Sequence, residues 1–326
     1  MKVKIESTEY YLPKKKESNN DLLIDNPSWD ISKIAEKTGI AYRSIASPSQ
    51  TAVDLAYEAG IKLINSTPSA KDIDLIVLVT QSPDYVLPTS ACILQNRLGL
   101  SKKCMAFDIN LGCSGFVYAM SVVSSLIESG VAKMGLILCS ETYSKYINKN
   151  DRTCRPIFSD GASASLLSPS ESDDIGPFVF GTDGSGFEKL IVKKGGAREP
   201  KKNNSSPFGL LEMNGSDVFL FTLGTIPTCI KTLLEKSNLK IKDIDLFVFH
   251  QASKLVLDNI MRSMSLNKSK VFTNLEKMGN TVSATIPIAL KDAESQKLIK
   301  NGDRVMLIGF GVGLSWGASI ITWRKS

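Results

Sequence analysis

Three residues whose side chains take part in nucleophilic chemistry stand at the ends of predicted secondary-structure elements. Cys113 follows the strand-like stretch CMAFDIN and begins a helix-like stretch, where the helix dipole and free backbone N–H groups favour the reactive thiolate. His250, the only histidine, ends a short apolar run that is typical of a buried strand. Asn280 lies in a Gly-Asn-Thr turn just before a second helix-like stretch. The sequence therefore offers a thiol, an imidazole and an amide for one site.

Each of these residues also has a structural interpretation, which the residues alone leave open. A buried structural cysteine, a core histidine with satisfied hydrogen bonds and a helix-capping asparagine are all common. The functional interpretation rests on position, because Cys113 precedes a central helix of one half of the chain and His250 ends a strand of the other half. The Gly-rich stretch GFGVGLSWG at 309–317 adds a loop that can bring a backbone N–H toward an oxyanion.

The elements that position these residues are duplicated. KDIDLIVLV at 71–79 returns as KDIDLFVFH at 242–250, an offset of 171 positions, and Val79 is the counterpart of His250. The same offset places KMGLILCS on RVMLIGFG, and both runs read as buried strands. Helix-like stretches occupy matching places in the two halves, at 87–99 and 252–264 and at 113–130 and 285–302.

Strands that alternate with helices predict an α/β fold with mostly parallel sheets. Two such halves, 1–172 and 173–326, stacked about a pseudo-twofold axis give five layers in the order αβαβα, with two helices at the centre. The boundary falls at SPSESDDIGP, where both periodicities stop. AREPKKNNSSP at 197–207 reads as a polar surface loop without chemistry.

Composition excludes several classes of protein. The 326 residues are 43% hydrophobic and 22% charged, with a net charge of +6 spread along the chain, so no nucleic-acid-binding stripe is expected. The six cysteines include no CxxC pair, which argues against a zinc site and a disulfide framework. No apolar run has the length of a signal peptide or a membrane span, and we expect a cytoplasmic protein that does not enter the membrane.

Four ordered motifs, GCSGF, HQAS, GNTVSA with IPIAL, and GFGVGLSWG, together resemble the β-ketoacyl-acyl-carrier-protein synthase III (KAS III) family of the thiolase superfamily. The resemblance covers essentially the whole chain, including DRTCRPIFSDGASASLL at 151–167. It implies a thiolase-like fold in which Cys113 is the nucleophile and His250 and Asn280 complete a Cys-His-Asn triad. It also implies a homodimer that needs no metal or cofactor and takes acyl-CoA or acyl-ACP and malonyl-ACP as substrates.

The implied reaction is a decarboxylating Claisen condensation in fatty-acid or related acyl-chain biosynthesis. Cys113 takes an acyl group as a thioester, and hydrogen bonds from His250 and Asn280 stabilise the enolate left when malonyl thioester loses carbon dioxide. The backbone N–H groups of Cys113 and Val312 form the oxyanion hole. Val312 stands where the family usually has glycine, an exchange that is tolerable if its φ is negative.

Sister families of the same superfamily fit less well. Elongating ketosynthases need a second histidine, degradative thiolases need a second cysteine in the C-terminal Gly-rich loop, and both are missing. Hydroxymethylglutaryl synthases use a glutamate near the strand that here runs into Gln81. Two alternatives stay open: an acyltransferase that passes the acyl group from Cys113 to an oxygen or nitrogen acceptor, and a non-catalytic carrier-binding subunit.

The chain departs from the family where the family binds coenzyme A. Lys33 occupies the position of the adenine-stacking tryptophan, and Trp29 lies one helical turn earlier. Lys37 replaces an arginine and so loses the guanidinium plane used for stacking, whereas Arg152 is retained. We therefore leave open whether coenzyme A is accepted.

Further departures concern the carrier protein and the acyl chain. Leu220 and Leu255 replace basic residues of the carrier-docking face, and Ser253 and Ser216 occupy positions where the family has amide side chains. Leu87 stands where the family has a bulky residue that gates the acyl pocket across the dimer interface. We expect the accepted acyl length to differ as well.

Overall fold

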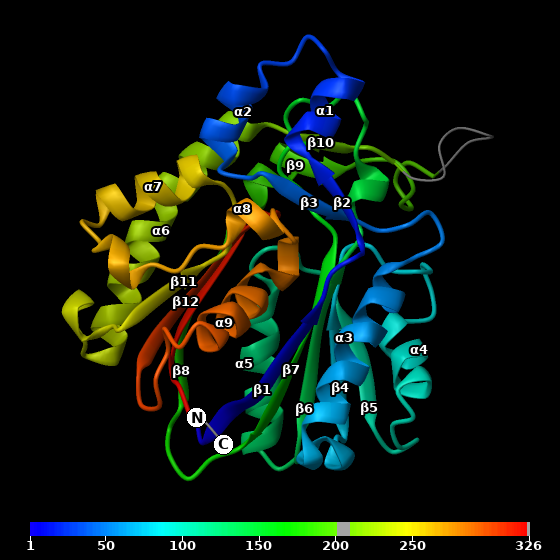
Figure 1. Cartoon of the computed structure of the whole chain (residues 1–326). Coiled ribbons are helices and arrows are strands. Elements are labelled where there is room, and N and C mark those ends of the chain that lie inside the picture. Colours follow the sequence, from blue (N-terminus) through cyan, green and yellow to red (C-terminus); the bar gives the residue numbers. More distant parts are fainter. Residues whose placement is uncertain (201–208, 325–326) are drawn as a thin grey trace.

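The computed structural model describes residues 1–200 and 209–324, which form the five layers predicted, helix, sheet, helix, sheet, helix (Figure 1). Two helices cover each outer face and two lie between the sheets. The outer helices on the first sheet are α3 (Ala52–Ser66) and α4 (Ser90–Arg97), the central ones are α5 (Gly115–Glu128) and α9 (Thr285–Ser295), and those on the second sheet are α6 (Gly215–Ser237) and α7 (Lys254–Ser263).

Two mixed sheets carry the central helices. The first has the order β1-β7-β6-β4-β5 and the second the order β11-β12-β13-β8. The strands of the first sheet are β1 (Val3–Tyr11), β4 (Leu75–Val79), β5 (Met105–Ile109), β6 (Gly135–Glu141) and β7 (Gly161–Pro169). Those of the second are β8 (Ile175–Thr182), β11 (Leu246–Phe249), β12 (Arg304–Gly311) and β13 (Ser315–Thr322).

The prediction of mostly parallel sheets was wrong. β4 is parallel to β5 and β6, and β11 is parallel to β12, but β7 and β13 run antiparallel to both of their neighbours. For β12 and β13 the reason is the length of the connection. Only three residues join β12 to β13, and a parallel pair needs a crossover of a dozen or more.

The duplication predicted from the sequence is confirmed by the matched strands. β4 and β11 begin 171 positions apart, at Leu75 and Leu246, and both are fully buried. The strand order β1-β7-β6-β4 of the first sheet corresponds to β8-β13-β12-β11 of the second. The fifth strand, β5, has as its counterpart in the second half a single parallel bridge between Phe247 and Val271. The boundary between 1–172 and 173–326 stays a prediction, and β8 begins just after it at Ile175.

The central helices differ in length. α5 is buried along one side by Phe116, Met120, Val123 and Ile127, the residues whose spacing predicted it. The helix expected over 285–302 ends instead at Ser295, because Lys297 adopts a left-handed conformation with φ 59° and Leu298 N–H turns back to the Ala293 carbonyl.

Smaller elements build the rim above the sheets. The hairpin of β2 (Lys15–Ser18) and β3 (Tyr42–Ile45) carries α1 (Asn19–Asp25) and α2 (Ile31–Thr38), while β9 (Leu190–Val192) pairs with β10 (Leu211–Met213), and α8 (Leu275–Met278) precedes Asn280. Helix α2 begins at the N-cap Asp30 and ends at Gly39, whose φ is 70°. Most of the loop predicted at 197–207 lies outside the described residues.

Among the described helices, α6 alone has the length and apolar composition of a membrane span. It packs on β8 and β13 of the second sheet and against α7, and 33% of its apolar window is buried.

Candidate active site

Cys113 lies where the first half of the chain enters the central layer. It follows β5, precedes α5 by two residues, and its side chain is only 4% exposed. Gly112 leaves room for this arrangement, since a Cβ there would lie 2.5 Å from Gln81 Oε1 and 2.9 Å from Val312 Cγ1. Gly311, at the end of β12, is equally close, because a Cβ on it would lie 3.0 Å from Cys113 Sγ. The thiol therefore sits between the two halves.

Burial raises the pKa of the Cys113 thiol to about 12, and the nearby Glu141 carboxyl acts in the same direction. The backbone N–H groups of Cys113 and Val312 act in the opposite direction, so both lie close enough to stabilise negative charge at this point. The thiolate expected from the helix terminus is thus outweighed by desolvation. Val312 is not among the described residues with positive φ, which meets the condition for replacing glycine.

His250 follows β11 directly, as predicted, and reaches the site from the second half. Its Nδ1 lies 2.7 Å from Thr285 Oγ1, and the edge of the ring meets Phe310 at an interplanar angle of 85°. Burial lowers the pKa of the imidazole to about 3, although the Val282 carbonyl acts in the opposite direction. The ring is therefore neutral at physiological pH and carries one proton.

Asn280 is held by its neighbours on both its backbone and its side chain. Its N–H donates to the Ile157 carbonyl and its carbonyl accepts from Ser159 N–H, which ties the turn to the segment before β7. Val282 N–H donates to Asn280 Oδ1 at 2.9 Å, so the amide nitrogen must face the other way. That nitrogen lies 3.4 Å from His250 Nε2. Asn280 is thus not the N-cap of the following helix α9, which is Ala284, and its N–H groups face the imidazole.

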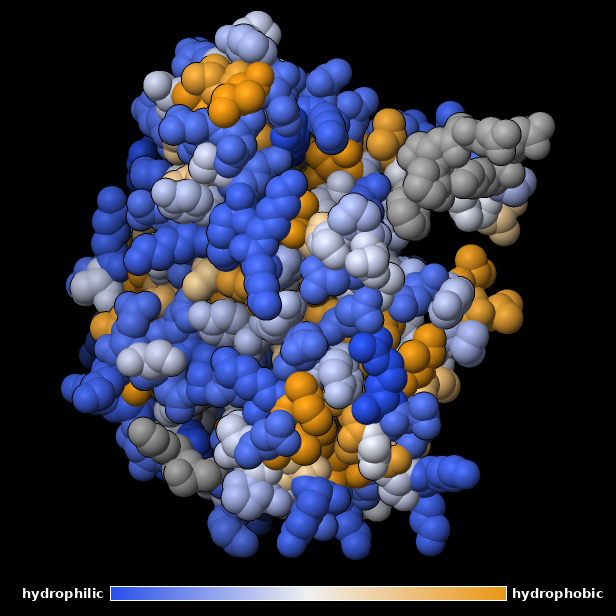
Figure 2. Space-filling model, turned by 45° about the vertical axis from the view of Figure 1, so that its right-hand side comes forward, coloured by the Kyte–Doolittle hydropathy of each residue, from blue (hydrophilic) through white to orange (hydrophobic). Residues whose placement is uncertain are grey.

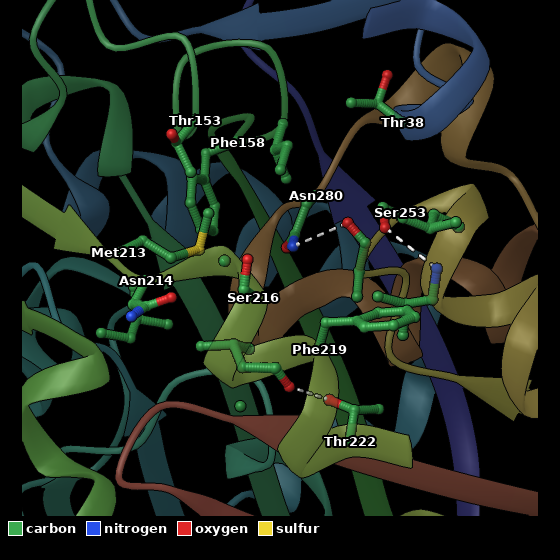
Figure 3. Close-up of a pocket in the computed structure, with 18 of the residues that line it drawn as sticks. Thr38, Thr153, Phe158, Met213, Asn214, Ser216, Phe219, Thr222, Ser253 and Asn280 are labelled. Carbon is green, nitrogen blue, oxygen red and sulfur yellow. Dashed lines mark hydrogen bonds between the residues drawn. The ribbon is translucent and has the colours of Figure 1, made fainter.

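A cavity of about 1210 Å³ joins the three residues to the surface. Cys113, His250 and Asn280 all line it. Figure 3 shows Asn280 beside Ser253 on one wall, with Met213, Asn214 and Ser216 on the other. The structure therefore brings the predicted triad together at the inner end of one cavity.

The other predicted binding residues divide into two groups. Lys33 and Lys37, one helical turn apart on α2, line the cavity together with Arg152 and Ser253, and so do Leu220 and Leu255. The two leucines are 66% and 43% exposed. Trp29 and Leu87 do not line it, and Leu87 is 79% exposed on the loop before α4.

Glu141 is a buried carboxyl beside the site that our sequence analysis missed. Ser82 Oγ donates to it at 2.8 Å, Gln81 N–H at 3.1 Å, and Ser283 Oγ from the second half at 3.2 Å. Burial raises its pKa to about 8, although these donors act in the opposite direction. An acidic residue ending the apolar run GLILC was the available signal. Glu141 links the Asn280 turn to the half that carries Cys113.

Val282 and Thr285 were missed as well. Val282 has a φ of 55°, a left-handed conformation that is unusual for a β-branched residue. This conformation turns its N–H toward Asn280 and leaves its carbonyl for the backbone N–H of Thr285. Nothing in the sequence pattern indicates this left-handed conformation.

Among the described residues, no cluster of three or more metal-ligating side chains occurs.

Two mixed sheets around two central helices, with a thiol at the start of one helix, define an enzyme of the thiolase-like class. The chain matches the family model for 3-oxoacyl-(acyl-carrier-protein) synthase III over residues 107–184 and the model for the C-terminal part of the same family over residues 234–323. It is 38% identical to the β-ketoacyl-acyl-carrier-protein synthase III of Clostridioides difficile (strain 630), over 96% of each chain.

Solved structures of the same family superpose on this chain over nearly its whole length. A crystal structure of a 3-oxoacyl-(acyl-carrier-protein) synthase III superposes with a TM-score of 0.95 at 42% identity, covering 99% of this chain and 100% of that one. The enzyme from Thermus thermophilus gives a TM-score of 0.91 at 33% identity, covering 99% and 100%. The chain belongs to the β-ketoacyl-acyl-carrier-protein synthase III family. It is a condensing enzyme that transfers acyl groups, which favours condensation over acyl transfer to an oxygen or nitrogen acceptor and argues against a non-catalytic subunit.

Proposed function

We propose that this condensing enzyme works through Cys113, His250 and Asn280 in two half-reactions. In the first, the thiol attacks an acyl thioester, the carrier thiol leaves, and the acyl group stays on Cys113. In the second, malonyl thioester loses carbon dioxide and the resulting enolate carbon attacks the acyl carbonyl, which releases Cys113 and gives a β-ketoacyl thioester. One observation carries the proposal: a thiol flanked by two backbone N–H groups shares a cavity with two side-chain nitrogens 3.4 Å apart.

The first half-reaction uses the backbone around the thiol. The N–H groups of Cys113 and Val312 that lower the pKa of the thiol are suited to hold the oxyanion formed when sulfur attacks a carbonyl. Because burial keeps the resting thiol protonated, its proton must leave as the carbon–sulfur bond forms. In the balanced exchange this proton ends on the departing carrier thiol.

The second half-reaction uses the two side-chain nitrogens. An oxygen about 2.9 Å from both His250 Nε2 and Asn280 Nδ2 fits between donors spaced 3.4 Å apart. The thioester carbonyl of the malonyl group supplies such an oxygen, which becomes negatively charged as carbon dioxide leaves. No strong base is required, because the departing carboxylate provides the electron pair of the enolate.

The mouth of the cavity suggests how the thioester is delivered. Lys33, Lys37 and Arg152 are exposed cations on its wall and suit the phosphate of a phosphopantetheine arm. Leu220 and Leu255 add exposed apolar side chains at the same cavity, which suit a carrier protein. Acyl carrier protein is therefore the expected partner, and acyl-CoA is accepted only if the lysines on α2 replace aromatic stacking on the adenine.

A second copy of the chain is the proposed cover for the side that carries β5. Strand β5 is an edge of its sheet, and in the loop beside it Tyr85, Val86 and Leu87 are 61%, 94% and 79% exposed. Figure 2 turns this side forward and shows apolar side chains at the surface. Pairing two β5 edges would bury this loop and bring Leu87 to the partner's acyl pocket.

All six cysteines are free, in keeping with work in the reducing cytoplasm.

Intact-protein mass spectrometry tests the proposal. The enzyme is incubated with a panel of acyl-CoAs and acyl carrier-protein thioesters and then with malonyl carrier protein, and Cys113→Ala serves as the control. We expect an adduct that requires Cys113 and disappears with release of carbon dioxide once malonyl thioester is added. An adduct that malonyl thioester leaves untouched would refute the condensing mechanism and redirect the search to acceptor nucleophiles.

A further inference from the structure

Thr285 lies behind the imidazole, on the side away from the cavity. It is the first residue of α9, its side chain is buried, and its Oγ1 lies 2.7 Å from His250 Nδ1. The opposite ring nitrogen, Nε2, faces Asn280 at 3.4 Å. The hydroxyl is therefore the hydrogen-bond partner of the ring nitrogen that does not face the cavity.

The hydroxyl proton has two acceptors within reach, the ring nitrogen of His250 and the Val282 carbonyl. Thr285 Oγ1 lies 3.0 Å from the Val282 carbonyl, which is farther than the 2.7 Å to the ring nitrogen. That carbonyl already accepts the backbone N–H of Thr285. The carbonyl oxygen has a second lone pair and stays a competing acceptor. The shorter distance to the ring nitrogen is what favours the hydroxyl proton on the bond to His250 Nδ1.

The contact on the other side of the ring agrees with this assignment. Because Val282 N–H fixes Asn280 Oδ1, the amide presents its N–H groups to Nε2 and to the Ala252 carbonyl. A separation of 3.4 Å between Nε2 and the amide nitrogen is long for a hydrogen bond. Such a distance is expected if both nitrogens carry protons that point to the same place in the cavity. An acceptor oxygen of the substrate would then lie between them.

We propose that Thr285 is a positioning residue that donates its hydroxyl proton to His250 Nδ1 and thereby holds the ring proton on Nε2, where it can be donated to the substrate. This inference rests on the proposed role of His250 in decarboxylation. It assigns the direction of a hydrogen bond and adds no chemical step. If the hydroxyl were removed, the Val282 carbonyl would accept a hydrogen bond from a proton on Nδ1.

The Thr285→Val variant should slow the second half-reaction and leave the first unchanged. Valine has nearly the same shape but no hydroxyl, so the ring proton is expected to move to Nδ1 and donate to the Val282 carbonyl, which leaves Nε2 as an acceptor. Decarboxylation of malonyl thioester should then fall by about 10²-fold, the usual loss for one oxyanion donor. Transfer of the acyl group to Cys113 should stay near the wild-type rate, because that step does not need a proton on Nε2. Thr285→Ser keeps the hydroxyl and should keep most of the decarboxylation rate.

Because His250 is the only histidine, nitrogen NMR of protein labelled at the histidine ring reports on this one residue. We expect the proton on Nε2 in the wild type and in Thr285→Ser, also with an amide-linked malonyl-pantetheine bound, and on Nδ1 in Thr285→Val. A wild-type ring protonated on Nδ1 overturns the proposal, even if Thr285→Val does not fold. So does a Thr285→Val enzyme that decarboxylates at the wild-type rate, or one that loses both half-reactions equally with its tautomer unchanged. A His250→Ala enzyme that still condenses would instead overturn the proposed function.

Discussion

A methyl group at position 311 would test how tightly the two halves hold the nucleophile. A Cβ on Gly311 would lie 2.9 Å from Cys113 Cβ and 3.0 Å from its Sγ, whereas carbon atoms in contact stay about 3.5–4.0 Å apart. The thiol carbon must therefore retreat by about 0.5–1 Å. A misplacement of about 1 Å costs roughly 10²-fold in rate, and overpacking a core costs about 1–3 kcal/mol of unfolding free energy. Gly311 has no positive φ, so the backbone itself tolerates alanine.

The measurement is the rate of acyl-enzyme formation on Cys113 in Gly311→Ala, by rapid mixing and mass spectrometry, with circular dichroism melting in parallel. Gly224→Ala is the matched control. Gly224 is exposed on α6 with open space around it, so alanine there should leave acylation unchanged and raise stability by about 0.5–1 kcal/mol. If Gly311→Ala forms the acyl-enzyme at the wild-type rate and melts like the wild type, the close approach of β12 to the thiol is not as described.

Three further predictions follow from the same geometry. Asn280→Ala should slow malonyl decarboxylation by about 10²–10³-fold while acylation of Cys113 persists, and equal loss of both steps would contradict the donor role. Glu141 has its pKa raised from 4.5 to about 8 in the folded protein, so the folded state binds the extra proton and stability falls as pH rises through this window. Denaturant titrations at several pH values should show a shallower fall in Glu141→Gln, and an unchanged pH dependence would count against the buried carboxyl. Val86→Asp should weaken self-association in sedimentation velocity if a second copy covers its loop, whereas Lys268→Asp, also exposed but in the second half of the chain, serves as a charge control for nonspecific effects.

The sequence predicted those parts of the site that lie at the ends of strands and helices. Short apolar runs located β4, β6, β11 and β12, and a residue that follows a buried strand must emerge at its carboxyl end, which places His250. Ordered motifs then identified Cys113 and Asn280 as its partners. The structure places all three residues on one cavity, as these local patterns indicated, and their catalytic roles stay predictions.

The remainder depends on contacts between the halves, which no local pattern specifies. Glu141 ends a strand of the first half, and its partner Ser283 precedes α9 in the second. The left-handed conformation of Val282 is imposed by bonds on either side of it, against the usual preference of valine. The antiparallel pair of β12 and β13 was missed for a related reason, because alternating elements predict crossovers only where the connections are long enough.

The duplicated scaffold holds a single site because its two copies are packed differently at equivalent positions. Applying the offset of 171, the first-half counterpart of His250 is Val79 and the second-half counterpart of Cys113 is Ala284. Val79 packs closely against α5, because its Cγ1 lies 2.4 Å from the place that a Cβ on Gly115 would take. A histidine at position 79 has a larger side chain and would clash with this helix. A mirrored site would therefore need a thiol in place of Ala284 and a helix α5 moved away from β4. Moving α5 would also displace Cys113, so within this packing the protein can keep one site and not two.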